Sequence, residues 1–181
     1  GRIASVGAGD AGETAPPTEP AGGCEFVDAS GMILLPGFVQ PHVHLCQALF
    51  RGLAEDRPLL DWLRSRIWPL EAAHDPRSMA ASARLGIHEM ISSGTTSAID
   101  MATVRHTDVI FEVAEGLGFR LRSGKAMMDI AAGAPPWLGD RGEDALRESS
   151  DLARRWHGAA GGLLGAVMSP RFRLGIDEGR L

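Results

Sequence analysis

Two histidines separated by one residue, His42 and His44, follow a short apolar run. Side chains two positions apart on a strand point to the same side, so both imidazoles could bind one metal ion. A His-x-His pair on its own is more often two histidines of a surface turn. Here residues 32–35 are apolar enough for a buried strand, and the Pro36-Gly37 step follows them. The pattern therefore predicts half of a metal site at the point where a barrel strand passes into its catalytic loop.

Strand and helix patterns alternate after the histidines. We expect helices over residues 59–73, 76–93, 107–117 and 143–157, and strands over 95–101, 119–128 and 163–168. Asp75 is the expected N-cap of the second helix, Thr107 caps the third, and Pro69 should kink or break the first. Together with the strand before His42, four strands alternating with helices predict a parallel sheet of βα units.

Composition excludes several classes of protein. The 181 residues are 44% hydrophobic and 23% charged, with a net charge of −5, which is typical of a globular domain and argues against a nucleic-acid surface. Apolar runs are shorter than the about 20 residues that span a bilayer. The two cysteines, Cys24 and Cys46, do not indicate a disulfide scaffold. We therefore expect a soluble, cytoplasmic protein without nucleic-acid or membrane partners.

The motif at residues 35–44, Leu-Pro-Gly-Phe-Val followed by His-Val-His, resembles the first barrel strand of the amidohydrolase superfamily. It is most similar to the purine deaminase and triazine chlorohydrolase group, and residues 58–63, 68–71 and 93–96 continue the match in order. The resemblance covers roughly the whole chain. It implies an α/β fold, with residues 1–33 in part of a small β-sandwich and residues 34–181 in the N-terminal half of a (β/α)₈ TIM barrel. A complete barrel takes about 250 residues, so we expect about the first four βα units.

The resemblance also implies one divalent metal ion, zinc or alternatively iron, with His42 and His44 as two of its ligands. In the resembled enzymes the other ligands and the proton-shuttling glutamate come from later strands, which would lie beyond Leu181. We therefore assign no general acid or base within this chain. The only lysine, Lys125, lies on the third strand, so the lysine that bridges two metals in related subgroups is absent from the fourth.

Three further residues match substrate contacts of the resembled enzymes. Gln47 and Arg171, the latter in a Pro-Arg-Phe sequence, match residues that hold the base in guanine deaminases. Glu71 matches a glutamate that adenosine-type deaminases use on ribose hydroxyls. The structural alternatives are a solvated loop residue for Gln47, a surface salt bridge for Arg171 and an exposed helix-end carboxylate for Glu71. Trp62 and Trp68 could line an aromatic wall, although core packing is the more frequent use.

The expected activity is hydrolysis of a non-peptide C–N bond. A metal-activated water would deaminate a purine base or nucleoside, so the expected partner is a small purine-like heterocycle, and a homo-oligomer is compatible with the family. One alternative is an s-triazine chlorohydrolase. Another is an inactive, truncated chain that lacks the remaining metal ligands.

Overall fold

The computed structural model describes residues 27–129 and 135–171. By their internal contacts the residues divide into two units, Gly1–Pro36 and Gly37–Leu181. In the first unit the described residues form a turn in which Ser30 donates from its backbone N and its Oγ to Asp28. The expected β-sandwich over residues 1–33 stays a prediction, because most of those residues lie outside the described ranges.

The apolar run 32–35 is not the buried strand that its composition indicates. Its side chains are more than 60% exposed, and the first strand of the second unit, β1 (Phe38–Val43), begins only after Pro36 and Gly37. Proline has no N–H to donate to a strand ladder. Pairing of the first strand with residues 94–101 begins at Phe38, whose backbone N–H donates to the Gly94 carbonyl at 2.9 Å.

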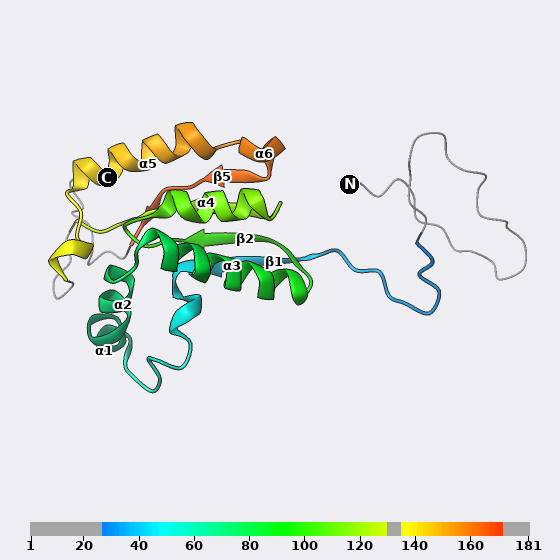
Figure 1. The fold of residues 1–181 in the computed structure, drawn as a ribbon, viewed down its shortest axis with the longest axis horizontal. Coiled ribbons are helices and arrows are strands. Elements are labelled where there is room, and N and C mark those ends of the chain that lie inside the picture. The colour runs from blue at the N-terminus through cyan, green and yellow to red at the C-terminus, as the bar shows by residue number, and fades with distance from the viewer. Residues whose placement is uncertain (1–26, 130–134, 172–181) are drawn as a thin grey trace, which may run out of the picture. The chain divides into compact units, whose positions relative to one another are not determined.

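A four-stranded parallel sheet forms the centre of the second unit (Figure 1). Its order is β1, β2 (Thr95–Met101), β3 (Arg120–Gly124) and β5 (Leu164–Ala166), with every neighbouring pair parallel. A second parallel pair, β4 (Ala126–Met127) with β6 (Ser169–Pro170), continues the last two strands. The expected α/β class with parallel βα units is confirmed. The break of the third strand at Lys125 was not predicted.

The helices that connect consecutive strands pack along the sheet (Figure 1). They are α3 (Pro76–Ser92), α4 (Thr107–Gly116), α5 (Gly142–Trp156) and the short α6 (Ala159–Gly162). Asp75 caps α3 as expected, in a reciprocal capping box with Ser78, and Gly94 follows the helix with φ +85°. The expected capping by Thr107 is wrong. His106 occupies the N-cap position in the left-handed region, so Thr107 is the first helical residue.

A helical arm connects β1 to α3. It consists of the 3-10 turn η1 (Leu45–Phe50), α1 (Leu59–Trp62), the π-helical turn η2 (Leu63–Ile67) and α2 (Trp68–Ala72). The helix expected over 59–73 therefore forms with a π-turn rather than a break. Pro69 has no N–H to donate to the preceding turn, and its ring crowds that turn. The preceding turn is the π-helical one, Leu63–Ile67. Another 3-10 turn, η3 (Pro136–Leu138), packs against α2.

Two apolar clusters hold these layers together. The larger lies between the sheet and α3, α4 and α5, and contains Met79, Ile87, Ile110, Phe111, Leu121 and Trp156. The smaller fixes the helical arm to the strand ends and contains Phe50, Leu63, Ile67, Trp68 and Met128. Burial of such side chains contributes about 1.5–3 kcal/mol each, so the arm is held firmly over the strand ends. Within the described residues no helix is long and apolar enough to cross a membrane.

Candidate metal and substrate site

His42 and His44 lie side by side at the end of β1. Their ring centroids are 4.9 Å apart and the ring planes are nearly perpendicular. His42 is exposed, whereas His44 is half-buried. Both rings line a cavity of about 290 Å³. The structure thus brings the two histidines together, as their spacing on one strand predicts.

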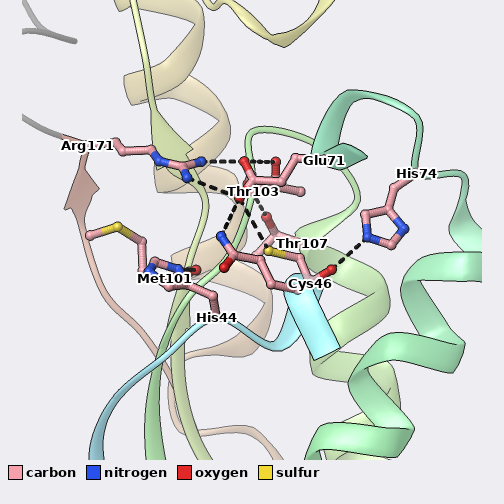
Figure 2. Close-up of polar contacts among 9 residues, drawn as sticks. His44, Cys46, Glu71, His74, Met101, Thr103, Thr107 and Arg171 are labelled. Carbon is pink, nitrogen blue, oxygen red and sulfur yellow. Dashed lines mark hydrogen bonds and ion pairs between the residues drawn. The ribbon is translucent and has the colours of Figure 1, made fainter. Parts of the chain in front are cut away.

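A backbone carbonyl of the neighbouring strand orients the His44 ring. His44 Nδ1 lies 2.8 Å from the Met101 oxygen (Figure 2), and since a carbonyl can only accept, Nδ1 carries the proton and Nε2 keeps its lone pair. Burial lowers the pKa of His44, which favours the neutral ring, while the hydrogen bond to Met101 opposes that shift. A neutral imidazole fixed through its second nitrogen is the form that binds metals.

These two residues fit part of a metal site. Paired neutral imidazoles suit zinc and iron(II), and a catalytic zinc site takes about three protein ligands. Among the residues that the structure describes, no group of three or more His, Cys, Asp or Glu side chains is placed to hold an ion. His42 and His44 are therefore placed to offer two nitrogen donors to one ion, and a complete site needs further donors.

Asp100 anchors the turn that follows His44. Its Oδ1 accepts from the Leu45 amide at 2.8 Å and its Oδ2 accepts from Ser123 Oγ at 2.6 Å. Asp100 is fully buried, and this burial raises its pKa to about 6, against the opposing effect of the Ser123 and Leu45 hydrogen bonds. Sequence reasoning missed this residue. The available signal was a carboxylate inside the apolar strand 95–101.

Glu71 is the centre of a buried polar network beside the histidines (Figure 2). Both of its oxygens accept from the Arg171 guanidinium, with Nη2 to Oε1 at 3.0 Å and a second bond from Nη1 to Oε2. Gln47 Nε2 donates to Oε1 at 2.7 Å, and Thr103 Oγ1 donates to Oε2 at 3.3 Å. The Cys46 thiol lies 3.9 Å from Oε1. The three residues singled out as substrate contacts thus meet in one network.

Burial excludes the structural alternatives for two of these residues. Glu71 is 2% exposed and Arg171 is 3% exposed, so neither is a surface group. Arg171 is placed by its backbone N–H, which donates to the Met127 oxygen at 3.1 Å where β6 pairs with β4. On the opposite side, His74 Nε2 bonds the Cys46 oxygen at 2.7 Å and its ring stacks on Phe50, which fixes η1.

Apolar side chains form the remaining wall of the cavity. Leu59, Trp62, Leu63 and Met101 line it together with Gln47 and Arg171. The two tryptophans that could have formed an aromatic wall lie in different places. Trp62 lines the cavity, whereas Trp68 is buried in the smaller core cluster. Flat apolar walls with a few polar groups are typical of sites for small heterocyclic ligands.

Comparisons with known proteins agree with this geometry. The model of the Amidohydrolase family matches residues 33–179. A curated relative, the 5-methylthioadenosine/S-adenosylhomocysteine deaminase of Syntrophomonas wolfei, is 36% identical over 80% of this chain and 31% of its own length. Escherichia coli guanine deaminase superposes with a TM-score of 0.73 at 32% identity, over 80% of this chain and 33% of that one. A zinc-bound adenosine deaminase from Xanthomonas campestris gives 0.69 at 28% identity, over 80% and 31%. The chain spans about a third of the length of these relatives.

Proposed function

Since this chain belongs to the amidohydrolase family, we propose that it supplies part of the active site of a metal-dependent hydrolase that deaminates a purine-type ring. The observation that carries the proposal is the ligand pair. His42 and His44 line one cavity. Because His44 Nδ1 is hydrogen-bonded to the Met101 oxygen, Nε2 is the nitrogen whose lone pair is left for a metal ion. The named relatives act as deaminases of purine-containing compounds, which supports the reaction class.

Each group of the site has a role in this proposal. His42 and His44 would hold a divalent ion, zinc or iron(II), and a bound ion of this kind lowers the pKa of a water molecule so that hydroxide is available near neutral pH. Gln47 and Arg171 would bind and orient the ring edge, while Trp62 and Met101 cover its face and exclude water. No general acid or base is assigned among the described residues.

The test is product release by the zinc- or iron(II)-loaded protein. Guanine, adenosine, 5-methylthioadenosine and a chlorinated s-triazine are offered, and ammonia and chloride are measured separately. We expect ammonia from at least one purine compound, and its loss in the His42→Ala/His44→Ala variant. Chloride without ammonia would instead favour the chlorohydrolase alternative.

Metal binding without release of either product would contradict the proposed activity and favour the truncated, inactive alternative. A cytoplasmic location and a homo-oligomeric assembly stay predictions.

A further inference from the structure

The turn that follows His44 begins without a cap of its own. The first amides of a helical turn have no partner inside that turn, and the residue at the N-cap position usually supplies a side-chain acceptor for them. For η1 the N-cap residue is His44, which makes no capping hydrogen bond. Its ring nitrogen Nδ1 is bonded to the Met101 oxygen instead. Leu45, the first residue of η1, is fully buried, so its amide needs an acceptor from elsewhere in the chain.

Asp100 supplies this acceptor from the neighbouring strand β2. Its Oδ1 accepts from the Leu45 amide at 2.8 Å, across 55 positions of the chain. Its Oδ2 accepts from Ser123 Oγ at 2.6 Å, which ties the carboxylate to β3. Asp100, Leu45 and Ser123 are each 0% exposed, so water does not compete for either bond.

Two consecutive residues at the end of β2 therefore hold His44 from two directions. The Met101 carbonyl accepts from the ring nitrogen Nδ1 at 2.8 Å, and Asp100 holds the amide of the residue that follows. The first bond fixes how the ring is turned, and the second fixes the backbone from which the ring extends. A ligand residue that is held at both places loses little freedom when it binds an ion.

Packing alone does not account for a carboxylate at this position, because burial of an ionisable group costs stability. Other groups hold the carbonyls of the same turn. Ser82 Oγ donates to the Leu45 carbonyl at 2.7 Å, and His74 Nε2 bonds the Cys46 carbonyl at 2.7 Å. Asp100 differs from these donors because it accepts from the backbone, at the amide directly after the candidate metal ligand.

We propose that Asp100 is a positioning residue of the metal site: it takes over the N-cap role of η1 from His44, so that the His44 imidazole is left for an ion and is already oriented before the ion binds. This inference rests on the proposed function, because it concerns the ligand pair of the same site. It predicts that loss of the Asp100 acceptor loosens His44 in the metal-free protein as well as in the loaded one.

NMR of the histidine ring nitrogens in the metal-free protein tests the proposal without requiring turnover. Above neutral pH the wild type is expected to show His44 with its proton on Nδ1 alone, and the His44→Ala variant identifies the His44 signals. Asp100→Ala should convert them to a rapidly averaged mixture of both ring tautomers, because the ring no longer meets Met101 at a fixed position. Asp100→Asn should restore the wild-type signals, since its side-chain oxygen still accepts from the Leu45 amide.

Metal affinity is the second readout. In titrations with Co²⁺ followed by absorption spectroscopy, Asp100→Ala should bind the ion about tenfold or more weakly than the wild type, which is the usual cost of removing a group that holds a ligand. Asp100→Asn should bind it nearly as tightly as the wild type. Ile110→Val is the control for lost stability, because Ile110 is fully buried in the larger core cluster and the change removes no hydrogen bond. It should alter neither the His44 signals nor the Co²⁺ affinity.

Three results would overturn the proposal. The first is an Asp100→Ala variant with the tautomer and the Co²⁺ affinity of the wild type. The second is a wild-type His44 without a fixed proton on Nδ1. The third is an equal loss in Ile110→Val, which would trace the effect to stability rather than to position. If Asp100→Ala fails to fold, Asp100→Val decides, since valine suits a strand position and offers no acceptor. Thermal unfolding of each variant checks this.

Two outcomes distinguish this inference from the proposed function. A His44 tautomer that depends on Asp100, in a protein that releases no ammonia from any purine compound, would contradict deamination and leave the positioning role intact. Full ammonia release by Asp100→Ala, with the Co²⁺ affinity of the wild type, would do the reverse.

Discussion

The Arg171 guanidinium donates hydrogen bonds to both carboxylate oxygens of Glu71, although the two residues are 100 positions apart in the chain. Both side chains are almost completely buried. Two charges removed from water are costly unless each is paired and hydrogen-bonded, and here the Gln47 and Thr103 donors complete the set around the carboxylate. The pair joins the residue that follows the last described strand, β6, to α2 of the helical arm.

Removal of one partner of this pair should destabilise the fold strongly. Arg171→Met leaves the Glu71 charge buried without its counterion, for which the expected loss in the free energy of unfolding is about 3–5 kcal/mol. The double variant Glu71→Leu/Arg171→Met should recover much of that loss. Urea unfolding followed by circular dichroism measures both. Arg51→Met, in the exposed pair with Glu89, is the control and should change little; equal losses in both single variants would contradict the argument.

The histidine pair should determine metal content. The purified protein is expected to retain zinc or iron after dialysis, and His42→Ala/His44→Ala should lose it, because the two imidazoles lie with their ring centroids 4.9 Å apart at one cavity. Elemental analysis by mass spectrometry gives the stoichiometry. His88→Ala, on the exposed surface of α3, is the control. Retention of metal by the double variant would show that the ion is bound elsewhere.

Asp100 should make stability depend on pH. Its pKa is about 6 in the fold, above the usual value near 3.9, so the folded state binds this proton more tightly than the unfolded chain. The associated stability is present below about pH 4 and is lost as the pH rises through 6, at a cost of about 3 kcal/mol.

Asp100→Asn removes this titration. Its side-chain oxygen still accepts from the Leu45 amide, and its NH₂ group can donate to Ser123 Oγ, which reverses the direction of the bond that Ser123 donates in the wild type. The variant should therefore gain stability relative to the wild type between pH 4 and pH 6, and the gap should stay constant at higher pH. Denaturant unfolding at several pH values measures the gap. A difference that does not vary with pH would show that Asp100 is not the titrating group.

Gly124 should tolerate no side chain. A Cβ at this position would lie 2.0 Å from the Val167 backbone oxygen, where β3 meets the segment after β5, so Gly124→Ala must push two paired segments apart. We expect a loss of about 1–3 kcal/mol in the free energy of unfolding. Gly116→Ala, at the end of α4 with open space around it, should instead be neutral or stabilise by about 0.5 kcal/mol. Thermal unfolding compares the two, and similar losses would contradict the steric argument.

Much of the scaffold could be predicted because its signals are local. The capping residue Asp75 and the strand 95–101 are predicted correctly from neighbouring residues. Prediction was wrong where a local signal had more than one structural outcome. The apolar run 32–35 is exposed rather than a buried strand. The helix with Pro69 does not break, and its irregularity is the π-helical turn Leu63–Ile67 before that proline.

The sequence by itself determined the parallel α/β class and the neighbouring positions of His42 and His44, because strand periodicity depends only on residues close in the chain. Only the tertiary structure decided what surrounds them. Register places Asp100 opposite Ser123, and the pairing of β4 with β6 puts Arg171 against Glu71. Such contacts depend on how distant segments pack, for which local patterns carry no signal. The same packing brings three polar residues that are far apart in the chain into one buried network.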